Sequence, residues 1–194
     1  MIVIKKIKAV ILFGVFGFSF LKVSAQEKLY TNEFPLENVT LLDGKFKNAR
    51  DLNMSVLLQY DVDRLLAPYR KEAGLEPRKP SYPNWEGLDG HIGGHYLSAL
   101  AMNYAATDNQ EFLARMNYML KELRECQLAN TKKHPEWGVG YVGGFPNSAA
   151  LWSSFKKGNF EKYNSAWAPF YNSHKMHAGL RDAWLYADSE KAKE

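Results

Sequence analysis

The feature that most constrains this chain is a helix-length segment, residues 91–106, that is apolar on every side. Tyr96 and Leu100 lie on one face of the expected helix, while Ala99 and Met102 lie on another. A helix without a polar face has to be covered by protein all round. The sequence therefore predicts a buried helix with other helices packed around it.

The next expected helix, residues 110–130, has the pattern of an amphipathic surface helix. Its apolar stripe includes Cys126, which we interpret as a buried structural cysteine. Asp108 and Glu111 have the spacing of a capping box, and the short connection makes the two helices antiparallel neighbours. The charged positions of this helix are expected to be exposed: Arg115, Lys121, Glu122, Arg124 and Glu125.

The remaining elements are read from changes of period and from breakers. Residues 33–42 are expected to be extended, and a helix that begins at Lys45 is expected to close near Pro68. A short helix is expected over residues 148–157, and a last full helix runs from 172 or 173 to 187, followed by the cap of another. The helix expected from Lys45 places these residues on one face: Phe46, Ala49, Asn53, Val56, Leu57 and Tyr60.

A weak internal repeat relates the segment at 91–106 to the segment at 172–187. Counted back from Asp108 and from Asp188, Leu100 corresponds to Leu180. Repeated pairs of an inner apolar and an outer amphipathic helix indicate an all-α toroid or solenoid. Two buried helices that look alike by chance are the alternative.

A closed ring of six helical hairpins takes twelve helices, which is about 200–300 residues at ordinary helix and loop lengths. The pattern here predicts four or five helices in 194 residues. We therefore expect an incomplete toroid, the N-terminal part of a longer protein.

The N-terminus has the layout of a secretory signal peptide. Lysines precede an apolar run at residues 9–21, and Val23 and Ala25 occupy the −3 and −1 positions of a small-residue cleavage site. Residues 1–25 are the predicted signal peptide, and residues 26–194 are the exported part, which we place in the periplasm or outside the cell. An uncleaved N-terminal anchor is the alternative.

The formal net charge of +4 depends on that leader. Cleavage would remove four lysines and leave equal numbers of basic and acidic residues. Without a basic stripe, a nucleic-acid partner is excluded, and no membrane association is expected after cleavage. The single cysteine excludes a disulfide framework within the chain.

Two pairs of histidines are the strongest candidates for a site. His91 and His95 are four residues apart, and His174 and His177 are three apart, each pair near the start of an expected inner helix. Such helix ends gather loops and outward-pointing N–H groups. Neutral imidazoles both donate and accept hydrogen bonds, which suits the hydroxyl groups of a sugar. A shared zinc ion and a purely structural role for buried histidines are the alternatives.

The segment before the second helix adds aromatic and acidic candidates. Trp85, like Trp137 and Trp167, lies in a loop where its ring is free to stack on a sugar. Glu86 is a candidate acid or base without a second carboxylate, and Asp89 is interpreted as the N-cap of the helix. Small residues nearby allow a backbone or a ligand to approach closely: Gly90, Gly93 and Gly94.

Three long motifs, at residues 85–101, 140–146 and 167–187, resemble the N-terminal part of glycoside hydrolase family 127, the β-L-arabinofuranosidase group. They begin Trp-Glu-Gly-Leu-Asp-Gly-His, Gly-Tyr-Val-Gly-Gly-Phe-Pro and Trp-Ala-Pro-Phe-Tyr-Asn-Ser-His-Lys. The resemblance implies a six-hairpin (α/α)6 catalytic barrel followed by β-sandwich modules. It also implies retaining cleavage of L-arabinofuranosides of plant-type glycans, so that the expected partner is an arabinose-containing carbohydrate.

In that family a zinc-bound cysteine is the nucleophile and a glutamate is the acid/base. Nothing in this chain matches those residues, so catalytic residues and zinc are expected only in the full-length protein. His174 carries over as a sugar contact, with His91 and His95 beside it. Two rival functions stay open, a non-catalytic glycan-binding or structural helical module and a six-hairpin polysaccharide lyase.

Overall fold

Helices make up all the regular structure that can be described in this chain. The computed structural model describes residues 34–83, 86–137, 139–161, 163 and 166–194, and the predicted signal peptide lies outside them. The helices belong to one compact unit, Pro35–Glu194. They are η1 (Leu36–Asn38), α2 (Lys45–Leu57), α3 (Val62–Glu72), α4 (His91–Thr107), α5 (Gln110–Lys133), η2 (Pro135–Trp137), α6 (Ser148–Lys156), α7 (Pro169–Ala187) and α8 (Glu190–Lys193).

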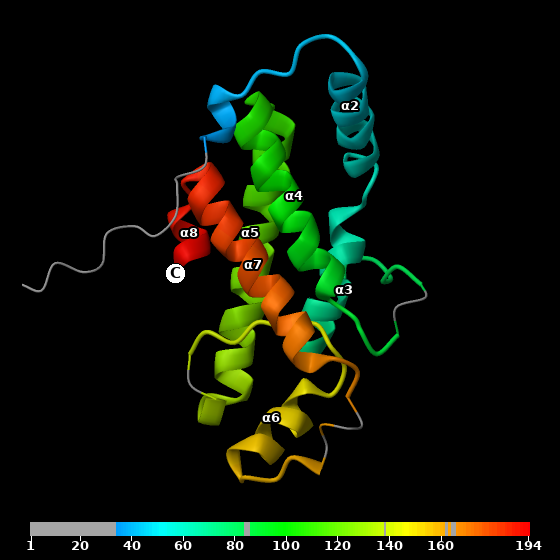
Figure 1. The fold of residues 1–194 in the computed structure, drawn as a ribbon. Coiled ribbons are helices and arrows are strands. Elements are labelled where there is room, and N and C mark those ends of the chain that lie inside the picture. Colours follow the sequence, from blue (N-terminus) through cyan, green and yellow to red (C-terminus); the bar gives the residue numbers. More distant parts are fainter. Residues whose placement is uncertain (1–33, 84–85, 138, 162, 164–165) are drawn as a thin grey trace, which may run out of the picture. The chain divides into compact units, whose positions relative to one another are not determined.

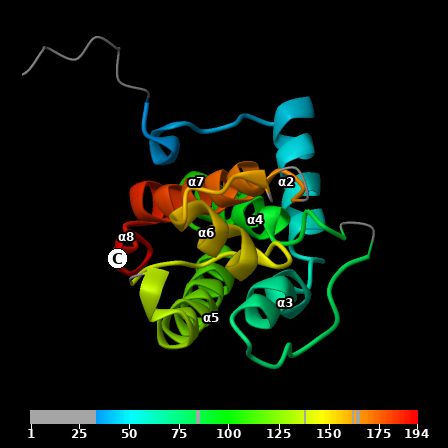
Figure 2. The same cartoon turned by 90° about the horizontal axis from the view of Figure 1, so that it is seen from below.

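The helices lie in two rows. Figure 2 shows α4 and α7 side by side in one row, with α3 and α5 in the other. α4 and α7 run parallel, because Gly94 meets Lys175 near their beginnings, while Tyr104 lies near Leu185 at their ends (Figure 1). α5 returns antiparallel beside α4. The all-α fold predicted from the sequence is thus confirmed, as an arrangement consistent with part of an (α/α)6 toroid.

Glycines let α4 and α7 touch backbone to backbone. A Cβ on Gly94 would lie 2.2 Å from the carbonyl oxygen of Lys175, and one on Gly179 would lie 2.4 Å from the carbonyl oxygen of Gly94. No side chain fits at either position without moving a helix. The close approach that the small residues predict is therefore made by a backbone.

The two segments related by the internal repeat, α4 and α7, end in the same kind of turn. α4 ends at Asp108 and α7 ends at Asp188, both with a left-handed backbone, at φ of 53° and 49°. An extended residue follows each of them and starts the next helix, Asn109 before α5 and Ser189 before α8. The predicted capping box is wrong in its first residue: Asn109, not Asp108, accepts the N–H of Glu111, at 2.9 Å.

The apolar stripe of α5 forms much of the core, together with α3, α4 and α7. Cys126 is fully buried there, and burial raises the pKa of its thiol to about 12. Its interpretation as a structural cysteine agrees with this position. The core residues of α5 are Phe112, Met116, Met119, Leu120, Leu123 and Cys126.

The start of the chain differs from its prediction. The segment expected to be extended contains η1 and, in its described part, no strand. The helix expected from Lys45 to about Pro68 is two helices, because Asp61 caps a new one by accepting the N–H of Asp63 at 3.0 Å. Pro68 lies inside α3, which continues to Glu72.

The face of α2 that its pattern predicts to be packed is largely open. None of its residues is buried, and Phe46 is 82% exposed. α4 is likewise not covered on every side, since His95 and Met102 are exposed. Both helices therefore pack on some of the sides that their sequences predict and not on others.

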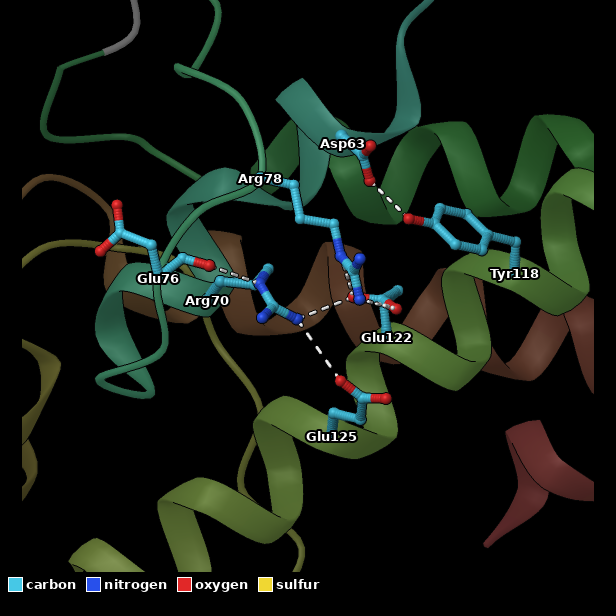
Figure 3. A network of polar contacts seen from close by, with 7 residues as sticks. All are labelled: Asp63, Arg70, Glu76, Arg78, Tyr118, Glu122 and Glu125. Carbon is cyan, nitrogen blue, oxygen red and sulfur yellow. Dashed lines mark hydrogen bonds and ion pairs between the residues drawn. The ribbon is translucent and has the colours of Figure 1, made fainter.

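An ion network ties the connector between α3 and α4, which contains Pro77, Pro80 and Pro83, to α5, and the exposure predicted for one member of the network is wrong. Glu122 is 1% exposed, and its carboxylate forms ion pairs with the guanidinium groups of Arg70, at 2.7 Å, and Arg78, at 2.9 Å (Figure 3). Arg70 also donates to the backbone carbonyl of Glu76, at 2.9 Å. The charge pattern of α5 misled because two arginines from α3 and the connector satisfy a carboxylate that the pattern assigns to solvent.

No helix in the described part of the chain has both the length and the apolar character needed to cross a membrane.

Candidate functional site

The candidate site is built where α4 and α7 begin, and the backbone there is held by unusual packing. Gly90 precedes α4 with φ of 94°, and a Cβ on it would lie 2.9 Å from Cα of Gly144. Tyr69 donates a hydrogen bond to the Gly90 carbonyl, and its burial raises the pKa of its hydroxyl. The end of the glycine-rich segment 139–144 thus packs against the entry to α4.

Asn172 joins the beginning of α7 to the same turn. Its side chain is buried, and its amide nitrogen donates to the backbone carbonyls of Leu88, at 3.2 Å, and Asp89. Asp89 is not the N-cap of α4, because Gly90 holds that position and the Asp89 carboxylate accepts the N–H of Gly87 at 2.7 Å. The loop before α4 is therefore fixed by α7 and by its own tight turn.

A cluster of four side chains, His91, His95, Tyr171 and His174, lies along these two helix starts; we refer to it as the histidine cluster. The ring centroids of His91 and His95 are 6.2 Å apart, and each ring lies about as far from Tyr171, at 6.0 and 6.3 Å. Nε2 of His95 lies 3.2 Å from the hydroxyl of Tyr171. A pair of residues from α4 is thereby joined to α7 by a polar contact.

The members of the cluster differ in burial and charge. His91 is buried, and its Nδ1 donates to the carbonyl of Leu88 at 2.7 Å, whereas His95 and His174 are exposed. Partial burial lowers the pKa of His95, and the positive charges of Lys175, His91 and His174 lower it further. At neutral pH His95 is therefore an uncharged ring that can accept one hydrogen bond and donate another.

His177 lies apart from this cluster. α7 begins at Pro169, a turn earlier than predicted, so that His174 and His177 are in its second and third turns. Nδ1 of His177 hydrogen-bonds the carbonyl of Ser173 at 2.8 Å, and the ring lines a hollow of about 450 Å³ with Trp137 and Leu180. The proline at the first helical position was the missed signal.

The tryptophans proposed to stack on sugar are only partly placed. Trp85 lies outside the described residues, and nothing tests its role. Trp167 is 58% exposed and lies against Gly87, in front of α4, where its ring is open to a ligand. Trp137 stacks on His134 with ring centroids 3.9 Å apart, and is half-buried. Glu86 is exposed.

The described residues do not fit a metal ion. Within them, no three His, Cys, Asp or Glu side chains are close enough to hold one. Cys126 is in the core, beside Glu122 and far from solvent. Tyr171 and Asn172 were not singled out from the sequence: Tyr171 precedes the predicted start of the last helix, and Asn172 lies at that start.

Comparison with known proteins decides the family. A family model described as the GH127 catalytic domain of β-L-arabinofuranosidase matches residues 38–194. The chain belongs to the GH127 family. This match covers all of the described helices except the beginning of η1, and it includes the histidine cluster. A search of the curated proteins finds no match to the chain. Residues 38–194 therefore belong to a glycoside hydrolase domain, whose substrate class is carbohydrate.

Proposed function

We propose that this GH127 chain forms the N-terminal wall of the catalytic domain of an exported, retaining glycoside hydrolase that acts on L-arabinofuranosides of plant-type glycans. The histidine cluster carries the proposal. It presents imidazole and phenol groups from two parallel helices of the family domain, and these groups match the hydroxyls of a sugar in both donors and acceptors.

Each proposed residue has a distinct part. His95 and His174 are exposed and bind hydroxyls directly, while buried His91 holds its ring against the Leu88 carbonyl and fixes the wall behind them. Trp85 supplies a stacking surface from the loop before α4. His177 faces the hollow on another side of α7 and contacts a glycan only if that glycan extends past the helix.

The chain's own residues supply binding and orientation in this proposal, and no bond-breaking group. The nucleophile, the acid/base and the zinc ion of the family are assigned to residues outside this chain, because its motifs do not match those residues of the family. The chain alone is accordingly proposed to bind an arabinofuranoside without cleaving it. Export follows from the predicted signal peptide at residues 1–25.

Isothermal titration of the chain with arabinofuranosyl oligosaccharides tests the proposal. We expect saturable binding that falls at least tenfold in His174→Ala and in His95→Ala. His134→Gln is the matched control, since His134 is the remaining histidine of the five and stacks on Trp137, away from the cluster. Binding that survives both cluster substitutions, or is lost equally in the control, contradicts the proposal. Hydrolysis of the oligosaccharide by the chain alone contradicts the absence of catalytic groups.

A further inference from the structure

A hollow of about 450 Å³ lies beside the face of α7 that carries His177. Its other walls come from η2, from the segment that follows η2 and from α6. We refer to it as the tryptophan hollow, because Trp137 of η2 and Trp152 of α6 both line it. The residues of α7 in its lining have the spacing of one helix face: Ser173, Met176, His177 and Leu180. Tyr171 and His174 are not among them, so the hollow and the histidine cluster share no residue of this helix.

Ring carbons form the apolar wall of the tryptophan hollow. The rings of Trp137 and Tyr141 meet edge to face with centroids 5.2 Å apart, and those of Tyr141 and Trp152 do so at 6.1 Å. The indole nitrogens of both tryptophans and the hydroxyl of Tyr141 are buried, so that a ligand in the hollow does not reach them. Such a ligand meets aromatic carbon instead, and Met176 and Leu180 continue the wall. Edge-to-face contacts between the rings hold this wall in place before a ligand binds.

Among the polar side chains of the lining, acceptor groups outnumber donor groups. Nδ1 of His177 donates to the carbonyl of Ser173 at 2.8 Å, which leaves Nε2 of the neutral ring as an acceptor. The Ser173 hydroxyl donates to the carbonyl of Pro169 at 3.1 Å, so that it offers its lone pairs to a ligand. Glu136 adds an exposed carboxylate, while Lys156, whose ammonium donates to the Glu136 carbonyl, supplies positive charge. The lining therefore suits a ligand that brings several hydrogen-bond donors.

This balance favours a neutral, hydroxylated ligand over an acidic one. Each sugar hydroxyl carries a hydrogen that it can donate, and Glu136, Ser173 and His177 can receive such bonds. A ligand carboxylate only accepts hydrogen bonds, so it would find a partner in Lys156 alone and would be repelled by the Glu136 carboxylate. The tryptophan hollow thus combines a surface of ring carbon for C–H groups with acceptors for hydroxyl groups.

We propose that the tryptophan hollow is a carbohydrate-binding site for a neutral pyranose unit. A pyranose chair with equatorial hydroxyls has flat C–H faces that stack on an aromatic ring, while its hydroxyls point outward to the polar side chains around it. The puckered furanose ring has a smaller face of this kind. The volume of the hollow lies within the range of about 300–1,000 Å³ that is usual for small-molecule sites. Binding here does not depend on the arabinofuranoside binding proposed for the histidine cluster.

Isothermal titration of the full chain with xylotriose, a neutral trisaccharide of pyranose units, tests the proposal. We expect saturable binding of one molecule per chain, weakened about fivefold or more in His177→Ala and in Lys156→Ala, because each substitution removes a hydrogen-bonding group from the lining. Lys157→Ala is the matched control, since Lys157 is the next residue and does not line the hollow, and it should change the Kd by less than about twofold. All three side chains are exposed, so the variants should fold, which their thermal unfolding checks.

The absence of xylotriose binding overturns the proposal, as does binding that Lys157→Ala weakens as much as Lys156→Ala does. Tighter binding of trigalacturonate than of xylotriose overturns the choice of a neutral ligand. His95→Ala and His174→Ala should leave xylotriose binding within about twofold of the unmodified chain, and a loss in these variants assigns the sugar to the histidine cluster instead. If arabinofuranosyl oligosaccharides fail to bind the cluster while xylotriose binds the hollow, the proposed function fails and this inference stands.

Discussion

α4 and α7 end in the same turn and run parallel, yet one is buried and the other is half open. α4 buries Tyr96, Leu97 and Leu100, whereas α7 leaves Trp184 37% and Leu185 43% exposed. The difference comes from their neighbours. α4 contacts α2, α3, α5 and α7, while α7 packs mainly on α4 and the short α8 and touches α6 through the rings of Phe170 and Trp152. Similar helix sequences thus reach different burial, and the histidine cluster forms where the two meet.

The strongest way to break this pair is to place a side chain at the helix contact. Gly94→Ala puts a Cβ 2.2 Å from the Lys175 carbonyl oxygen, which is backbone and moves only if α7 moves. We expect a loss of about 3 kcal/mol or more in the free energy of unfolding, measured by urea denaturation. Ser98→Ala, one turn further along α4, is the control and should lose less than about 0.5 kcal/mol. Equal losses in the two variants would contradict the described contact.

The next largest effect concerns the ion pairs that attach α3 and the α3–α4 connector to α5, which packs beside α4. Glu122→Ala leaves Arg70, which is 12% exposed, without its main carboxylate partner (Figure 3). We expect a loss of about 2–4 kcal/mol, because a buried charge loses its partner. Glu125→Ala, one turn on, removes a carboxylate that is 44% exposed and 3.5 Å from Arg70, and should lose about 0.5 kcal/mol or less. The comparison fails if the two substitutions are equivalent.

Thiol labelling sharpens the contrast between the core on α5 and the open side of α7. Burial raises the pKa of Cys126 to about 12. At pH 8 we expect iodoacetamide to react with the native chain slower than with the urea-unfolded chain by on the order of 10³-fold. Labelling of the native chain at the unfolded rate would show that α5 does not pack on α4 as described.

The smallest expected effect is the pH response of the cluster. The pKa of His95 is lowered in the folded chain, so the folded state binds fewer protons than the unfolded state. Its contribution to stability is present above the unfolded pKa of about 6.5 and declines as the pH falls through the folded value. Lys175→Gln should raise the pKa of His95 in an NMR titration, while Lys132→Gln on α5 should leave it unchanged. A lowered or unmoved value in Lys175→Gln would contradict the electrostatic account.

Much of the helical pattern could be predicted from the sequence, because α4 is a continuous apolar segment, α5 has a clear amphipathic stripe, and only two residues separate the two helices. The repeat around Asp108 and Asp188 also predicted a real turn. The burial of Glu122 could not be predicted, since its partners Arg70 and Arg78 come from a distant segment and only tertiary packing brings them together.

The candidate site was predicted in part. His91 and His95 do lie at the start of α4, but the earlier start of α7 brings Tyr171 into the site, and His177 lines the hollow instead of joining the cluster. Pro169 marks that start in the sequence, because its ring suits the first position of a helix. A contact such as His95 to Tyr171 depends on how two helices cross, which no local pattern specifies.

NMR of the histidine side chains during titration with an arabinofuranosyl oligosaccharide tests the central claim most directly, with each signal assigned from single His→Gln variants. The account predicts that the ring signals of His95 and His174 move together and saturate, while those of His134 stay in place. Saturating shifts at His134 or His177 alone, or no shift at His95 and His174, would contradict the assignment of the sugar-binding surface to the start of α4 and α7.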